Sequence, residues 1–209
     1  MATGSTYIGA PHAGFSILKR WGENLPGGYR VFTSNVDGQF QKAGFGDEKV
    51  FECHGSIHHL HCLKPCSSAI WRVDDFLPEV DMAACRLRNA PPTCPHCGGP
   101  TRPNILMFND TGWCDSREVR QSIQQDRWLA TVTRPVVIEL GAGTDIPTVR
   151  NFGTRVVRHH GGHLVRINPR ECGIANSAEI GLRMGAVEAL RGIAAALGEP
   201  WAPYETVVI

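Results

Sequence analysis

The chain lacks the apolar run of about 20 residues that a membrane-spanning helix needs, and its first residues combine neither a basic start nor an apolar stretch. We therefore expect no membrane association and no secretory signal peptide. An excess of one charge is also missing, because 21 Lys and Arg residues stand against 20 Asp and Glu residues, and this disfavours direct binding to nucleic acid. Without a secretory signal, the eight cysteines predict thiols in a reducing, cytoplasmic compartment.

Alternating apolar segments indicate the fold class. The chain has 209 residues, 42% of them hydrophobic, which suffices for one domain with a real core and a small insert. Its apolar patterns predict helices over residues 12–24, 37–43, 116–131, 147–160 and 177–197, and buried strands over residues 30–33, 50–51, 135–140 and 163–168. Strands that alternate with helices at this spacing predict an α/β fold with a parallel sheet flanked by helices.

Four cysteines form two short-range pairs. Three residues separate Cys62 from Cys66, two separate Cys94 from Cys97, and 27 residues lie between the pairs. Each pair lets two sulfurs from one turn reach a single tetrahedral Zn²⁺; two disulfides or four free thiols are the alternatives. A site closed by four thiolates has no exchangeable position, so the metal is predicted to be structural and the chemistry to lie elsewhere.

The segment around these cysteines differs in composition from its flanks. It contains Trp71, the acidic pair Asp74-Asp75 and the Pro91-Pro92 pair. Small segments of this kind fold around a metal ion, because the ion replaces a core that the segment cannot build. We therefore expect a zinc-binding small domain over residues 57–104, inserted into a main domain made of residues 1–56 and 105–209.

Polar residues and glycines follow the predicted strands. Asn35, Asp37 and His54 follow the first two strands, and the segments Gly141-Ala142-Gly143 and Asn168-Pro169 follow the last two. In parallel sheets, ligands bind beyond the carboxyl ends of the strands. Glycine N–H groups can approach phosphate, amides and carboxylates can bind ribose, and a histidine can take a proton. A tight turn and a helix cap are the simpler interpretations of the glycines and of the Asn35 region, but together the groups predict a nucleotide site.

The order of these motifs resembles that of the sirtuin family of NAD-dependent protein deacylases. The resemblance covers residues 29–170. Its segments are Thr33-Ser34-Asn35-Val36-Asp37, Glu52-Cys53-His54-Gly55-Ser56, the four cysteines, Arg102-Pro103-Asn104-Ile105-Leu106-Met107-Phe108, Gly141-Ala142-Gly143 and Ile167-Asn168-Pro169. The resemblance implies a Rossmann-like NAD-binding domain with a small inserted zinc-binding module.

The resemblance also implies a reaction and a set of site residues. The reaction transfers an acyl group from a lysine of a protein substrate to ADP-ribose and releases nicotinamide, with His54 as the general base and Asn35 orienting the ribose. The implied NAD-binding residues are Ser34, Asn35, Asp37, Gly141, Ala142, Gly143, Asn168 and Pro169. The implied contacts to the acylated lysine are Leu106 and Phe108, and the implied zinc ligands are Cys62, Cys66, Cys94 and Cys97.

Some family features have no counterpart in this sequence. The family begins with a strand and a Gly-Ala-Gly-x-Ser loop, and nothing before Asn35 matches them. We therefore expect the first βα unit of the NAD-binding domain to be absent. Asn109 and Asp110 also replace a Gly-Glu pair near the place where a peptide docks. Two further functions therefore remain open: an NAD glycohydrolase or ADP-ribosyl transferase on the same fold, and a catalytically inactive zinc-stabilised module.

Overall fold

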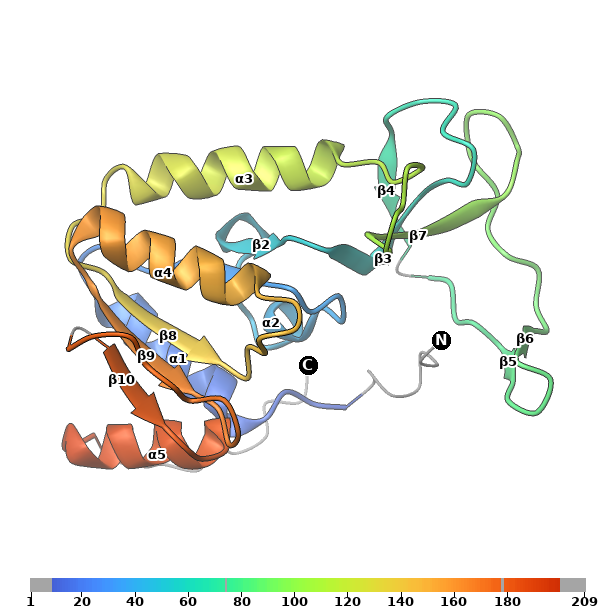
Figure 1. Cartoon of the computed structure of the whole chain (residues 1–209). Helices are drawn as coiled ribbons and strands as arrows, with labels where there is room; N and C mark the ends of the chain where they lie inside the picture. Colours follow the sequence, from blue (N-terminus) through green and yellow to red (C-terminus); the bar gives the residue numbers. More distant parts are fainter. Residues whose placement is uncertain (1–8, 74, 178, 200–209) are drawn as a thin grey trace. The chain divides into compact units, whose positions relative to one another are not determined.

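The computed structural model describes residues 9–73, 75–177 and 179–199, and Figure 1 labels its helices and strands. The chain divides into two compact units, the first made of Met1–Ala10 with Val31–Gln125 and the second of Pro11–Arg30 with Asp126–Ile209. Residues 1–8, where the sequence predicts no signal peptide, lie outside the described part. Among the described residues, no helix combines the length and the apolar character that a membrane crossing requires.

A parallel strand pair belongs to the first unit. β1 (Val31–Thr33) and β2 (Val50–Glu52) pair so that Phe32 lies opposite Phe51. The two rings meet edge to face with centroids 5.0 Å apart, an arrangement that aromatic quadrupoles favour. The chain between these strands forms the helix α2 (Gln39–Lys42) and the 3-10 turn η2 (Asp47–Lys49). The predicted strand–helix–strand order is confirmed here, with a helix shorter than the predicted residues 37–43.

The predicted insert folds as antiparallel strands. Three of them form a sheet in which β3 pairs with a neighbour on each side, and two more form a separate pair. The strands are β3 (Gly55–Cys62), β4 (Ile70–Arg72), β5 (Val80–Asp81), β6 (Arg86–Leu87) and β7 (Thr101–Ile105). β3 begins one residue after His54 and ends at Cys62, so one strand joins the predicted catalytic residue to the predicted metal site.

The second unit is a parallel sheet with helices on both faces. Its strands, in spatial order, are β10 (Glu179–Leu182), β9 (His163–Ile167) and β8 (Val136–Leu140), and its helices are α1 (Ala13–Asn24), α4 (Thr148–His160) and α5 (Ala186–Ala196). α1 and α5 pack on one face, where Ile17, Ile167 and Leu190 form a buried core. α4 lies on the other face (Figure 1), where its Gly153 packs close to Leu164. A parallel sheet needs cover on both faces, and the predicted α/β class is confirmed.

One predicted element is wrong. The sequence predicts a single helix over residues 177–197, but the described part of this range forms the strand β10 first, and α5 begins only at Ala186. The strand forms because Glu179–Leu182 pairs in parallel with β9. Gly181 permits its close approach to the preceding chain, since a Cβ at this position would lie 2.2 Å from the carbonyl oxygen of Cys172. Gly185 then adopts extended backbone and precedes the first turn of α5.

Candidate active site and metal centre

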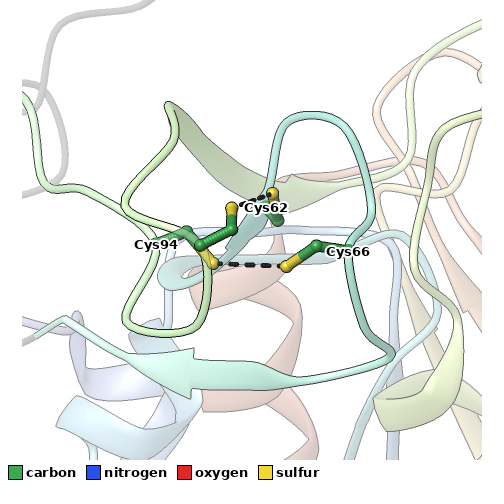
Figure 2. Close-up of side chains that lie close together, drawn as sticks. Cys62, Cys66 and Cys94 are labelled. Carbon is green, nitrogen blue, oxygen red and sulfur yellow. Dashed lines mark hydrogen bonds between the residues drawn. The ribbon is translucent and has the colours of Figure 1, made fainter.

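The four predicted metal ligands meet at one point of the first unit. Figure 2 shows the side chains of Cys62, Cys66 and Cys94 directed toward one another. All four sulfur atoms, including that of Cys97, lie within 4.8 Å of one another. The Sγ–Sγ distance is 3.7 Å between Cys62 and Cys97 and 3.6 Å between Cys66 and Cys94. A Zn–S bond of about 2.3 Å places tetrahedral sulfurs about 3.8 Å apart, so the four thiols fit a zinc ion.

Local backbone structure holds the second cysteine pair in place. Cys94 donates its N–H to the carbonyl oxygen of Gly99, and its own carbonyl accepts the N–H of Gly98, both at 2.8 Å. These bonds close a tight turn that carries Cys97. The four cysteines are thus positioned to bind a structural Zn²⁺ with thiolate ligands alone, as predicted.

The segments that follow β1 and β2 lie against each other. Two backbone hydrogen bonds of 2.9 Å join them, in which the N–H groups of Cys53 and Ile57 donate to the carbonyl oxygens of Thr33 and Val36. His54 lies between the two donors in sequence, and Asn35 lies between the two acceptors. The backbone therefore brings the predicted base and the predicted ribose-binding amide into one region of the first unit.

Asp37 has a structural role in this region as well. Its Oδ1 accepts the N–H of Gln39, the first residue of α2, at 3.1 Å, although the N-cap of that helix is Gly38 and not Asp37. Its carbonyl oxygen lies 3.2 Å from Nε2 of His58, a residue that the sequence analysis did not select. A Cβ on Gly38 would lie 2.7 Å from the same ring. His58 therefore packs on the Asp37–Gly38 backbone, a contact for which the sequence contains no local signal.

His54 is half-buried, and its burial lowers the pKa of the imidazole below the ordinary value. The ring is therefore neutral at neutral pH, which is the form that can accept a proton. The carbonyl oxygen of His54 accepts the N–H of Leu106 at 3.0 Å. This bond attaches the start of the predicted acyl-lysine segment to the backbone of the predicted base.

Glu52, two residues before His54, forms a buried ion pair. Glu52 is 1% exposed and pairs with Arg117 of α3 (Ser116–Leu129). Burial raises the pKa of Glu52, while the Arg117 guanidinium opposes that rise. Gln121, one turn further along α3, accepts the Glu52 N–H at 3.2 Å. Sequence analysis missed both partners, and the only signal for them is their spacing of four residues on a helix.

An ion pair holds the segment that carries Leu106 and Phe108. Arg102 donates to both carboxylate oxygens of Asp110, at 2.9 and 2.5 Å, and to the carbonyl oxygen of Ile105 at 2.9 Å. The same carboxylate accepts backbone N–H groups on both sides of the turn, those of Met107 and Gly112 at 3.3 Å. Phe108 is 85% exposed at the tip. The turn therefore presents apolar side chains to solvent while a charged pair fixes its base.

Asp110→Asn is expected to lower the free energy of unfolding by about 2 kcal/mol, because hydrogen bonds to charged groups contribute about 1.5–3 kcal/mol and this carboxylate is nearly buried. Urea unfolding measures the change. Asp81→Asn is the matched control, since Asp81 pairs with an exposed arginine, Arg88, and exposed pairs contribute little. A loss in Asp110→Asn as small as the one expected for Asp81→Asn would show that the turn does not depend on the Asp110 charge.

The second unit contains the other predicted cofactor residues. The loop Gly141-Ala142-Gly143 follows β8, and Asn168-Pro169 follows β9. Asn168 joins the two loops, because its Nδ2 donates to the Ala142 carbonyl oxygen at 3.1 Å. Arg150 of α4 donates to the same carbonyl oxygen through Nε and a terminal nitrogen, at 3.1 and 2.9 Å. Arg150 and the neighbouring Glu171 were missed, although both lie within ten residues of a predicted loop.

Known proteins resemble this chain in sequence. The model of the Sir2 family matches residues 6–132, more than half of the chain. An "NAD-dependent protein deacylase" of Aquifex aeolicus is 28% identical over 185 residues, which cover 88% of this chain and 67% of the relative. An "NAD-dependent protein deacylase 2" of Corynebacterium efficiens is 29% identical over 195 residues, 90% of this chain and 68% of the relative. The chain thus spans about two thirds of the length of both relatives.

Solved structures resemble the fold. The complex of a Sir2 homologue with NAD superposes with a TM-score of 0.65 and 21% identity, covering 93% of this chain and 69% of that one. A Sir2 protein bound to an acetylated peptide gives a TM-score of 0.61 and 23% identity, covering 90% and 71%. At these identities the likeness shows the sirtuin α/β fold.

Proposed function

The chain belongs to the Sir2 family, and from this premise we propose that it is an NAD-dependent protein deacylase. The reaction would transfer an acyl group from a lysine of a protein substrate to ADP-ribose and release nicotinamide. The names of the relatives from Aquifex aeolicus and Corynebacterium efficiens support this proposal. The observation that carries it is the pair of backbone hydrogen bonds that places the Asn35 segment against the His54 segment.

Bound NAD would supply the ADP-ribose that accepts the acyl group. His54 would take a proton from a ribose hydroxyl, and its half-buried, neutral imidazole suits that role. Asn35 would orient the ribose, Asp37 would hold the nicotinamide carboxamide, and Ser34 would also contact NAD. Leu106 and Phe108 would contact the acylated lysine, and their exposure on a fixed turn agrees with such a role.

We also propose residues of the second unit as contacts of the adenosine half of NAD. The residues proposed for it are Gly141, Ala142, Gly143, Asn168 and Pro169, at the carboxyl ends of β8 and β9. Ligands of parallel sheets bind at such strand ends. We further propose that residues 57–104 act as a zinc-binding small domain within a main domain of residues 1–56 and 105–209, and that the metal touches no reacting atom.

Mass spectrometry of the products tests the proposed activity. The chain is incubated with NAD, with and without an acetyl-lysine peptide. O-acetyl-ADP-ribose and nicotinamide that appear only with peptide are the expected result. ADP-ribose without peptide would instead identify a glycohydrolase, an outcome that the Asn109-Asp110 substitution keeps open. No product in either tube would contradict an enzymatic role and favour an inactive module.

We also propose a cytoplasmic location. The eight cysteines are all unpaired, and four of them lie where thiolates would bind zinc. Free thiols and thiolate metal sites suit a reducing compartment.

A further inference from the structure

His58 of β3 contacts the segment that follows β1. Its Nε2 lies 3.2 Å from the carbonyl oxygen of Asp37. A carbonyl oxygen can only accept a hydrogen bond, so this nitrogen is the donor. The same imidazole lies against Gly38, because a Cβ at Gly38 would be 2.7 Å from a carbon atom of the ring. The ring therefore makes two different contacts with one turn, a hydrogen bond to Asp37 and packing against Gly38.

The conformation of Gly38 allows this close approach. Its φ of 68° lies in the left-handed region, which glycine adopts without the strain that a Cβ would cause. Gly38 is buried and Asp37 is half-buried, so the turn is packed into the first unit directly before α2. The Asp37 carbonyl oxygen is thus held by a side chain 21 residues further along the chain.

The side chain of Asp37 is held from the other direction. Its Oδ1 accepts the N–H of Gln39 at 3.1 Å. A carboxylate offers about four lone-pair sites, and this bond uses one of them, so acceptor capacity remains for a ligand. His58 fixes the backbone of Asp37 and Gln39 fixes its carboxylate. Together these two contacts determine the direction in which Asp37 presents its remaining acceptor sites.

We propose that His58 is a positioning residue for the nicotinamide group of NAD. By holding the Asp37 carbonyl oxygen, it aims the Asp37 carboxylate at the N–H groups of the carboxamide. The inference rests on the proposed function, in which Asp37 holds that carboxamide. An acceptor that is already held in place loses less freedom when the ligand binds. His58 acts through Asp37 in this role, so its effect should be restricted to ligands that carry nicotinamide.

A purely structural role of the same side chain is the alternative. His58 is half-buried, and its backbone makes bonds of its own: its N–H donates to Oγ of Ser56 at 3.2 Å, and its carbonyl oxygen accepts the N–H of Val73 at 3.0 Å. These backbone bonds do not depend on the imidazole. Substitutions that separate the hydrogen bond to Asp37 from the packing against Gly38 therefore distinguish the two roles.

Calorimetric titration of the whole chain with two ligands tests the role of His58. Carba-NAD keeps the nicotinamide and cannot release it, whereas ADP-ribose lacks it. His58→Phe keeps a ring and removes the donor, so it should weaken carba-NAD binding by about 3- to 10-fold, the usual effect of one hydrogen bond, and leave ADP-ribose binding unchanged. His58→Gln supplies an N–H at a similar reach and should retain the affinity for carba-NAD. His163→Phe, at an exposed histidine of β9, should change neither affinity.

A double variant tests whether His58 acts through Asp37. Asp37→Asn keeps an oxygen that can accept the Gln39 N–H and replaces the other oxygen with a donor, so it should weaken carba-NAD binding by itself. Adding His58→Phe to this variant should cause no further loss, because both substitutions remove the same interaction. A further loss as large as that of His58→Phe alone would overturn the proposed route through Asp37.

The other outcomes separate the inference from the proposed function. Unchanged carba-NAD binding in a folded His58→Phe protein would overturn the inference and leave the deacylase proposal intact. Equal weakening of both ligands would do the same and indicate a structural role. Melting followed by circular dichroism checks folding, and His58→Leu removes the donor if the phenylalanine variant does not fold. Failure of both ligands to bind to the unmodified chain would instead reject the NAD site, and the inference with it.

Discussion

Replacing His54 with alanine is expected to reduce acyl transfer from the acetyl-lysine peptide by about 10²–10⁴-fold, which is the range that a general base contributes. The expected loss is in the chemical step, because the imidazole of His54 is the group proposed to take the ribose proton. The backbone hydrogen bond at this position should survive the substitution. The backbone carbonyl of His54 accepts the Leu106 N–H, and alanine preserves that carbonyl. Product formation is measured by mass spectrometry and folding by circular dichroism.

The control for this variant is another histidine. His159 is exposed on α4, so His159→Ala should retain full activity. Glu52→Gln gives a second comparison, because Glu52 is buried in an ion pair with Arg117. It should lower stability more than it lowers the rate per folded molecule. An active His54→Ala protein would refute the assignment of His54 as the base, whatever the controls show.

Local patterns explain why much of the site could be predicted. The two cysteines of each pair lie three or four residues apart, and a metal site of this type depends on such short spacings. The shared location of the polar residues could be predicted from the apolar strands that precede them, since the carboxyl ends of parallel strands lie at the same edge of the sheet. Asn35 and His54 come together for this reason, because β1 and β2 are adjacent and parallel.

Other parts of the molecule depend on pairings between distant residues. Arg117 lies 65 residues beyond Glu52, and nothing in the helix pattern of α3 distinguishes a buried arginine from a solvated one. The side chains that α3 buries in this region are polar, as Arg117 and Gln121 show. Similarly, β10 is short, and only its parallel pairing with β9 separates it from the amphipathic helix that follows. Predicting such features requires knowing which distant segment pairs with them.

Removal of zinc is expected to give the largest loss of stability. Structural zinc sites of this kind contribute about 10–16 kcal/mol of apparent binding free energy, and strands β5 and β6 of the proposed insert pair over only two residues each. A strong chelator should therefore unfold the 57–104 segment, seen as a lower melting temperature and altered circular dichroism. Metal analysis before and after chelation should show the loss of one zinc ion per chain.

Cys94→Ser gives the same test without a chelator. Cys94 is 2% exposed and its sulfur lies 3.6 Å from that of Cys66, so serine would remove one of four ligands from a closed site. The variant should retain little zinc and melt at a lower temperature. Cys85→Ser is the matched control, because Cys85 is exposed and outside the four-cysteine cluster. If Cys94→Ser kept the zinc content and melting temperature of the unmodified chain, Cys94 would not be a ligand of a structural zinc ion.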